Sequence, residues 1–443
     1  EVPLRGLFEH PTIAGLARVL DGQTATARSP VIPRRDANQP VPLTFSQQQL
    51  WFFEQLHPGT PTYNVPEFWR LRGALNLPAL DAALTELVRR HEILRTVFLV
   101  EGDHPRQIIR EAKAVKALVT DLQSLPAGDR VAHAQRLADE EASTFFDLHA
   151  GPLFRARVLR LAPEDHWLLL NAHHTVTDGW SAGVLRRELA ELYGAFAAGR
   201  KPELPDLPLQ YGDFAAWQDQ WLKQEVFPRQ LEYWRSKLAD APEVMQLPTD
   251  RARPKVASQR GDEVSAVLPG AAVEGLRVVS QATGATHFMT VLALTQAWLA
   301  RCTGQGTIVV GTPSAGRDTA ELQRLIGFFV NMLALRLDVD GQWSFRELLR
   351  RAKALALEAY AHQDLPFEKL VQVLHPKRSA AYNPVFQVAL LHLRSGEGDW
   401  VVPGLQASAI NAHTGTTKFD LTIAFTEAKD ELRLNISYSR DLF

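Results

Sequence analysis

The chain has 443 residues, of which 46% are hydrophobic and 22% charged, so it is long enough to bury the cores of two or three compact units. Its net charge of -2, with no block of basic residues, argues against a nucleic-acid partner. The single cysteine excludes an intrachain disulfide framework and suits a reducing compartment, so we expect a cytoplasmic protein. No apolar run approaches the ~20 residues of a membrane span, and no signal-peptide pattern opens the sequence.

The chain begins with a short helical segment and a polar linker. Residues 1–21 predict an amphipathic helix around Thr12–Leu20. Residues 22–41 are rich in Pro, Ala, Thr and Arg and have no periodicity, which is typical of a linker. We therefore expect the folded region to begin near Pro42.

The first half of the folded region, residues 42–216, mixes helices with strands. Apolar spacing predicts helices over 46–56, 80–88 and 130–143, and the continuous apolar run 167–170 predicts a buried strand. A long aromatic helix over 211–221 lies midway along the folded region. It is the natural crossing to a second half.

Residues 217–443 repeat this alternation without repeating the sequence. The pattern predicts helices over 272–283, 287–301 and 345–360, and strands over 307–310, 333–339, 419–425 and 432–438. The last two strands are expected to form a hairpin through 427–430. Two halves of similar length and mixed pattern favour an α/β protein with two lobes rather than a single sheet.

The stretch that most suggests chemistry follows the predicted buried strand. His173, His174, Asp178 and Gly179 lie in one turn, and an amphipathic helix follows with Asp178 or Ser181 as its N-cap. Imidazole suits proton transfer near neutral pH, and glycine lets the backbone approach a ligand. Adjacent side chains on a strand point to opposite faces, so we expect one histidine to face substrate and the other to face the core.

The pattern His-His-x-x-x-Asp-Gly, continued here by Trp180-Ser181, resembles the core motif of condensation domains of nonribosomal peptide synthetases. Six further motifs of that family resemble stretches of this chain in the same order. They are Thr44–Trp51, Arg90–Phe98, Tyr211–Gln218, Ile326–Asn331, His362–Leu370 and Asn383–Gln387. The family usually has Arg where Gln49 stands. Seven motifs in order, from about Pro42 to Phe443, make the resemblance specific.

The resemblance implies a pseudo-dimer of two chloramphenicol-acetyltransferase-like lobes, arranged as a V with the active site in a tunnel between them. It also implies that a floor loop near Gly311–Asn331 and a crossover within Leu390–Thr417 bridge the second lobe to the first. Residues 1–21 resemble the C-terminal helix of a peptidyl carrier domain, and Asp441–Phe443 fit the point where such domains lead into an adenylation domain. The implied partners are an upstream donor carrier domain and downstream adenylation and acceptor carrier domains.

The family reaction joins an upstream acyl thioester to the amine of a downstream aminoacyl thioester, both carried on 4′-phosphopantetheine arms. A thioester is already activated, and the sequence has neither a Gly-rich nucleotide-binding loop nor a Gly-x-Ser-x-Gly nucleophile elbow. His173 and His174 are adjacent and lack a further Cys/His cluster, so we expect no metal. What remains is to place two tethered reactants, worth up to ~7–11 kcal/mol, and to handle one amine proton, worth ~10²–10⁴-fold in rate.

The resemblance also assigns roles to residues of the turn. It makes His174 the substrate-facing base or amine-positioning acceptor and His173 a supporting core residue. It pairs Asp178 with Arg317 of the other lobe, as a bidentate ion pair that fixes the turn. Gly179 could offer its N–H to the tetrahedral oxyanion. The remaining supporting residues are expected to be Trp180, Ser181 and Asn331.

Several alternatives stay open. An acyltransferase that uses soluble CoA could share the histidine motif, and an epimerising or dual epimerisation/condensation relative would keep the histidine pair. A heterocyclising relative would have Asp in place of the first histidine, and a non-enzymatic docking module would be expected to have lost both. Within the condensation domains, Ser46–Trp51, Gln55–Gly59 and Tyr63–Pro66 most resemble the LCL subtype, which takes a donor ending in an L-residue.

Overall fold

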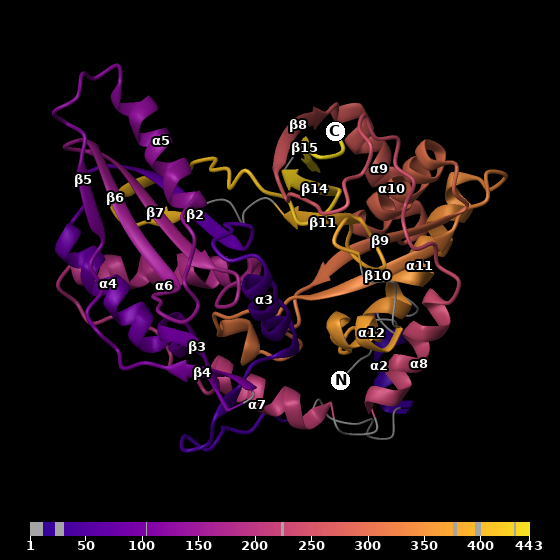
Figure 1. The fold of residues 1–443 in the computed structure, drawn as a ribbon, viewed down its shortest axis with the longest axis horizontal. Coiled ribbons are helices and arrows are strands. Elements are labelled where there is room, and N and C mark those ends of the chain that lie inside the picture. Colours follow the sequence, from indigo (N-terminus) through magenta and orange to yellow (C-terminus); the bar gives the residue numbers. More distant parts are fainter. Residues whose placement is uncertain are drawn as a thin grey trace.

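The computed structural model describes residues 12–22, 31–102, 104–222, 226–374, 379–394, 400–428 and 431–443. Figure 1 shows two mixed α/β units side by side, each built on a six-stranded sheet. The expected division into two lobes is therefore correct. Of the predicted N-terminal helix, Ile13–Gly22 (α2) is helical, whereas residues 1–11 lie outside the described part of the chain.

The first unit is built on a sheet with the strand order β12-β13-β2-β7-β6-β5. Its central strand β7 (Asp165–His173) pairs antiparallel with β2 (Asn64–Arg72) on one side and with β6 (Phe154–Ala162) on the other. The edge strand β5 (Leu118–Asp121) runs parallel to β6. The predicted buried strand is therefore the middle of this sheet.

Helices cover both faces of the first sheet. On one face, α4 (Leu77–Arg90) and α6 (Gly179–Ala197) form a core with Leu168, and on the other face α5 (Arg130–Ser143) packs with Leu169. Successive side chains of β7 thus enter different cores. This two-sided burial explains why the sequence of the strand shows no polar alternation.

The second unit has the strand order β10-β9-β11-β14-β15-β8. Its strands are β8 (Gly261–Leu268), β9 (Thr307–Ser314), β10 (Asn331–Asp338), β11 (Val388–Arg394), β14 (Leu421–Ala428) and β15 (Glu431–Ser439). Its helices are α8 (Val226–Leu238), α9 (Gly270–Thr283), α10 (His287–Thr303), α11 (Phe345–Tyr360) and α12 (Phe367–Leu374). The antiparallel pairing of β14 with β15 confirms the predicted hairpin, although residues 429–430 of its turn are not described.

Part of the predicted linker belongs to the first unit. Ile32 enters the first core, and Arg35 forms ion pairs with Asp213 at 2.9 Å and Glu92 at 2.8 Å. Close to this point, β1 (Val41–Pro42) joins β4 (His104–Ile109) and β3 (Thr96–Glu101) in a small three-stranded sheet. The linker expected over 22–41 therefore gives way to packed chain by residue 32, because its apolar and charged side chains find partners.

The passage between the units also lies later than expected. Helix α7 (Tyr211–Trp221) belongs to the first unit, since Phe214 lies in the first core and Trp217 packs against it. The first core residue of the second unit after α7 is Trp234, on α8. The change of unit therefore follows α7 instead of falling between residues 216 and 217.

Two segments of the second half reach back to the first unit. After β11 the chain forms β12 (Val401–Val402) and β13 (Leu405–Ala409) on the first sheet, where β13 pairs with β2, and then returns as β14. Figure 1 shows these yellow strands among the purple ones. Residues 315–330, which we call the floor loop, leave β9 and place Ile326 and Phe329 in the first core. The predicted crossover and floor loop are both confirmed, except that 311–314 belong to β9.

Candidate active site

The histidine turn joins the end of β7 to the start of α6. Asp178 is the N-cap of α6, and its carboxylate accepts a hydrogen bond from the N–H of Ser181 at 2.8 Å. Of the two N-caps that the sequence allowed, Asp178 is therefore the one used. Such a cap fixes the direction in which the chain enters the helix and so orients the turn before it.

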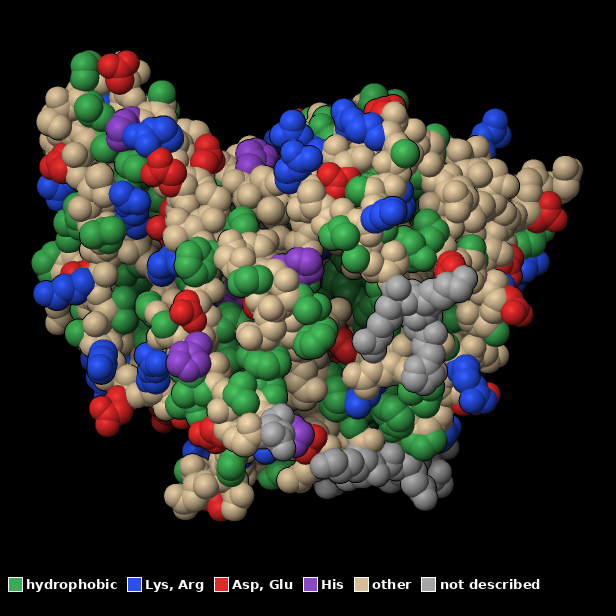
Figure 2. Space-filling view, in the orientation of Figure 1, with side chains coloured by type: hydrophobic (Ala, Val, Ile, Leu, Met, Phe, Trp, Pro, Cys, Tyr) green, Lys and Arg blue, Asp and Glu red, His purple; other side chains and the backbone are tan. Residues whose placement is uncertain are grey.

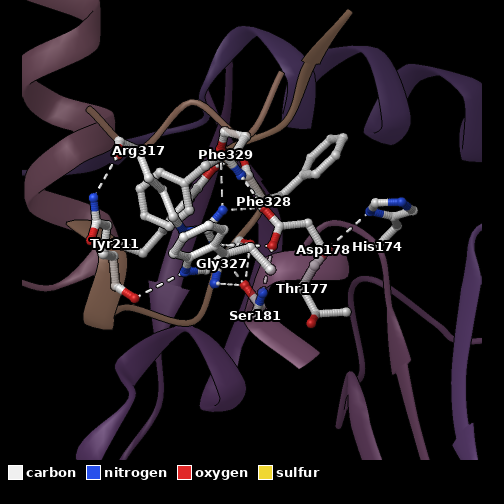
Figure 3. A network of polar contacts seen from close by, with 12 residues as sticks. His174, Thr177, Asp178, Ser181, Tyr211, Arg317, Gly327, Phe328 and Phe329 are labelled. Carbon is white, nitrogen blue, oxygen red and sulfur yellow. Dashed lines mark hydrogen bonds and ion pairs between the residues drawn. The ribbon is translucent and has the colours of Figure 1, made fainter. Parts of the chain in front are cut away.

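Asp178 also receives a buried arginine from the other unit. The two terminal nitrogens of Arg317 donate to its two carboxylate oxygens at 2.8 and 3.0 Å, and both side chains are 0% exposed. The N–H of Phe329 donates to the same carboxylate at 3.0 Å. The predicted bidentate pair is thus present. Figure 3 shows that the carboxylate points away from His174, so Asp178 orients the turn without contacting this imidazole.

The two residues after Gly179 attach α6 to the floor loop. The Oγ of Ser181 donates to the carbonyl of Gly327 at 2.9 Å and accepts from the N–H of Gly327 at 3.0 Å. The indole N–H of Trp180 donates to the carbonyl of Gln323 at 3.0 Å. Both residues therefore support the turn from its helical side, as expected.

His174 is half-buried and held in one tautomer. Its Nδ1 lies 2.8 Å from the carbonyl oxygen of Thr177, and a carbonyl can only accept, so Nδ1 carries the hydrogen and Nε2 keeps its lone pair. The ring of Phe328 packs edge-on at 4.7 Å. Burial, assisted by the positive charge of Lys418, holds the pKa of His174 well below its ordinary value. The imidazole is therefore neutral at pH 7 and able to accept a proton.

His173, in contrast to His174, is almost completely buried. It is 1% exposed, its Nδ1 lies 2.9 Å from the hydroxyl of Thr175, and its Nε2 lies 3.4 Å from Oε1 of Glu54. Burial lowers the pKa of His173, while Glu54 opposes this shift. His173 is thus a core residue beneath the turn, as the alternation along the strand predicts.

The two remaining expected site residues are Gly179, the first residue of α6, and Asn331, the first residue of β10. A Cβ built on Gly179 would meet no atom within 4 Å, so the space on the side-chain side of this residue is open. The side chain of Asn331 donates to the carbonyls of Gln363 and Leu365, both at 2.7 Å, and accepts from the N–H of Phe367 at 2.9 Å. Asn331 therefore holds the chain before α12 and does not support the histidine turn directly.

Other motif residues position the floor loop. The Nδ1 of His91 accepts from the N–H of Ile326 at 3.5 Å, while its Nε2 lies 2.8 Å from Glu188. The hydroxyl of Tyr211 donates to the carbonyl of Phe328 at 2.7 Å. Phe328 contacts His174 directly, so these distant motifs set one wall of the site.

Two residues near the histidines had no assigned role in the sequence. The ring centroid of Tyr63 lies 6.4 Å from those of both His173 and His174. The Nζ of Lys418 lies 4.9 Å from the centroid of Tyr63. These residues are far apart in the sequence. Tyr63 lies in a stretch that resembles the LCL subtype, but nothing local in the sequence predicts that either side chain lies near the histidines, so only the fold brings them to the site.

A cavity of about 970 Å³ opens between the two units, where α3 (Phe45–Leu56) faces α12 and β4. Gln49 and Glu368 are among its lining residues, and burial raises the pKa of Glu368 to about 7. Figure 2 shows the surface hollowed between the units, with charges of both signs interspersed around it. His174 does not line this cavity.

Within the described residues, no group of three or more His, Cys, Asp or Glu side chains could hold a metal ion. Among the described helices, none is both long and apolar enough to cross a bilayer.

The chain is similar in sequence to parts of large synthetases. Residues 37–443 match the family described as "Condensation domain". The chain is 43% identical over 452 residues to part of a linear gramicidin synthase from Brevibacillus parabrevis, covering all of this chain and 6% of that protein. It is 42% identical over 426 residues to phosphinothricin tripeptide synthetase PhsC of Streptomyces viridochromogenes, covering 96% of this chain and 39% of that protein. The chain thus spans less than half the length of these curated relatives.

Solved structures share the fold over nearly the whole chain. The X-domain from teicoplanin biosynthesis is 30% identical, with a TM-score of 0.83, over 94% of this chain and 93% of that chain. A complex of the X-domain with OxyB gives the same TM-score of 0.83 at 31% identity, over 95% of this chain and 92% of that chain. The first condensation domain of the calcium-dependent antibiotic synthetase, at 24% identity, matches with a TM-score of 0.76 over 92% of each chain.

Proposed function

The chain belongs to the condensation domain family, the amide-bond-forming acyltransferases of nonribosomal peptide synthesis, and we propose that it joins an acyl or peptidyl thioester on an upstream carrier to the amine of an aminoacyl thioester on a downstream carrier. The observation that carries this proposal is His174. Its imidazole is neutral, its Nδ1–H is engaged by Thr177, and its Nε2 is free to accept the proton that amide formation releases.

In the proposed reaction the amine nitrogen attacks the thioester carbonyl carbon, a C–N bond forms, and negative charge gathers on the carbonyl oxygen. His174 Nε2 takes the proton from the attacking nitrogen. When the C–S bond breaks, that proton can pass to the departing thiolate, so no external acid is consumed. Gly179 is the first residue of α6, where backbone N–H groups have no partner within the helix, so its N–H can donate to the oxyanion.

Asp178 and Arg317 contribute rigidity in this proposal. Arg317 donates to both Asp178 and Ser181, and the N–H of Phe329 donates to Asp178. The histidine turn therefore cannot rotate without breaking several buried hydrogen bonds to the floor loop. A fixed turn keeps Nε2 in place while two tethered reactants arrive, and such placement is the larger part of what this reaction needs.

The partners follow from the same proposal. The 4′-phosphopantetheine arms belong to the carrier domains and enter as parts of the substrates, through a tunnel between the lobes of a V-shaped pseudo-dimer. Residues 1–21 would end the donor carrier domain, and adenylation and acceptor carrier domains would follow Phe443 in a cytoplasmic synthetase. The likeness to the LCL subtype around Ser46–Trp51 suggests a donor ending in an L-residue.

A test is to load purified donor and acceptor carriers and to follow amide formation on the intact protein. We expect product with wild type and a loss of at least ~10²-fold with His174→Ala, while the thermal unfolding midpoint changes little. Turnover of His174→Ala within about tenfold of wild type would remove His174 from proton transfer. Donors ending in matched L- and D-residues, offered in the same assay, decide the subtype. A preference for D would overturn the LCL assignment, and product from both after inversion of the L-donor would indicate a dual epimerising enzyme.

Recruitment of a second protein is the alternative that the likeness to the X-domain favours, since that domain forms a complex with OxyB. The retained pair His173 and His174 argues for catalysis instead, because a docking module has no use for a neutral, oriented imidazole. Wild-type protein that makes no amide from any loaded pair, or that acylates only from soluble CoA, would favour the alternatives.

A further inference from the structure

Lys418 is a half-buried lysine that takes no part in the proton transfer proposed above. It lies where the crossover returns to the second unit, three residues before β14. Its neighbours are firmly held, since the N–H of Thr417 donates to the carbonyl of Gln259 at 2.9 Å and Asp420 pairs with Arg253. With the backbone fixed on both sides, the side chain reaches inward to Tyr63, whose ring lies edge-on to His174.

The ammonium of Lys418 has no carboxylate partner among the described residues. Three acidic side chains of this region pair with other groups: Asp420 with Arg253, Glu54 with His173 and Asp178 with Arg317. In Glu368, Oε2 is buried without a hydrogen-bond partner and burial raises the pKa to about 7. Burial lowers the pKa of Lys418 to about 8, so most of it is charged at pH 7. A cation held partly out of water without a counter-ion costs free energy, which makes Lys418 a candidate for a functional role.

We infer that Lys418 is a positioning residue for amide formation, whose positive charge across Tyr63 keeps both His174 and the incoming acceptor amine unprotonated. This inference rests on the proposed function. A cation repels a second cation, so the site disfavours an acceptor α-ammonium and admits the neutral amine, which is the form with a lone pair for attack. The same repulsion leaves His174 Nε2 free to take the proton afterwards.

The other charged and titratable groups around His174 leave a positive charge as the net electrostatic influence on its imidazole. From β7 comes His173, which is neutral because burial lowers its pKa. From α3 comes Glu54, which lies against His173, and from the segment before β2 comes Tyr63, whose pKa burial raises far above neutrality. Asp178 is neutralised by Arg317 and points away. Lys418 is thus the group whose unpaired charge acts on His174.

The test compares Lys418→Met with Lys418→Arg. Met keeps an unbranched side chain of similar length over Tyr63 and removes the charge, whereas Arg keeps the charge. In the carrier-loaded assay we expect the acid limb of the rate–pH profile to move up by about half a pH unit or more in Lys418→Met, which is ~3-fold in rate at a pH on that limb. Lys418→Arg should keep the position of the wild-type limb. A uniform loss of rate at every pH in Lys418→Met, or a profile equal to that of wild type, would overturn the inference.

A second readout does not require turnover. The imidazole signals of His174, assigned by their loss in His174→Asn, can be titrated by NMR in the intact protein from pH 8 down to the onset of acid unfolding. Removing a nearby positive charge raises the pKa of an imidazole, so Lys418→Met should protonate His174 at a higher pH than wild type or Lys418→Arg. If wild type forms no amide but this shift is present, the proposed function fails and the electrostatic coupling stands. An unchanged titration refutes the coupling whatever the activity.

Discussion

The histidine turn is held by a buried ion pair between the two units, an interaction whose formation costs both ions their hydration. Asp178 and Arg317 are both fully buried, and the carboxylate also caps α6 and accepts from Phe329. Such a pair contributes little net stability compared with apolar residues, because both ions lose their hydration. Its value here is geometric, since it specifies one arrangement of the floor loop against the histidine turn.

At the residue scale, we expect breaking this buried ion pair to cost far more stability than breaking an exposed one. Asp178→Ala leaves the guanidinium of Arg317 buried without a counter-ion, so we expect the free energy of unfolding to fall by ~3–5 kcal/mol and amide formation to fall with it. Glu274→Ala is the matched control, because Glu274 pairs with Arg277 on the surface, where both side chains are about half exposed. That change should cost less than ~1 kcal/mol. Chemical denaturation of wild type, Asp178→Ala and Glu274→Ala measures both changes in the free energy of unfolding. An Asp178→Ala protein as stable as Glu274→Ala would contradict this account.

At this scale the sequence predicts some partners and not others. The turn itself follows from local pattern, because His173, His174 and the capping Asp178 lie within six positions of one another. The partner Arg317 is 139 positions away from Asp178 and follows only from family resemblance. Tyr63 and Lys418 carry no local sign of function, since a tyrosine and a lysine are ordinary residues until the fold places them beside an imidazole.

At the scale of elements, the floor loop depends on one glycine before Arg317. Gly316 has φ of +64°, and a Cβ built there would lie 2.2 Å from the carbonyl oxygen of Phe329. A side chain at this position therefore meets both an unfavourable backbone conformation and a steric clash within the loop. The loop can reach Asp178 in this form only with glycine at 316.

We expect Gly316→Ala to destabilise the protein by more than Gly304→Ala, and to reduce amide formation as well. Gly304 is a matched control because it has a similar φ of +69°, but a Cβ there would meet no atom within 4 Å. Gly304→Ala should cost only the left-handed conformation, about 1–2 kcal/mol. Thermal unfolding and the carrier-loaded assay separate the two effects, and equal behaviour of the two variants would show that the loop tolerates the clash by moving.

Elements with strong local patterns are predicted well, and elements shaped by distant partners are not. The helices near 80–88, 130–143, 287–301 and 345–360 follow from apolar spacing and differ from the structure by a few residues at their ends. Strand β2 escapes prediction because it contains Pro66 and lacks regular alternation. The structure accommodates Pro66 since β13 pairs only with Trp69–Arg72, which leaves the backbone nitrogen of Pro66 facing no partner strand.

At the scale of the whole molecule, the crossover ties the two sheets into one body. Trp400 anchors it in the first unit: the side chain is 6% exposed, its ring packs edge-on against Trp69 at 5.5 Å, and its indole N–H donates to the carbonyl of Arg186 at 2.9 Å. Five residues later β13 adds to the edge of the first sheet. The candidate active site combines the histidine turn with the floor loop that follows β9, so its geometry depends on this tie as well as on the floor loop.

We therefore expect Trp400→Ala to loosen the crossover while each sheet keeps its own core. Truncating a buried tryptophan typically costs ~3–5 kcal/mol of stability. Here the lost contacts are those between the crossover and the first unit, so hydrogen exchange of the amides of Gln406–Ala409 should accelerate strongly. Amides of the β14–β15 hairpin should keep their protection. Val401→Ala is the control, because the neighbouring Val401 is 83% exposed and its truncation should change stability by less than ~0.5 kcal/mol. Protection at 406–409 equal to that of Val401→Ala would mean that the strand pairing of β13 alone holds the two units together.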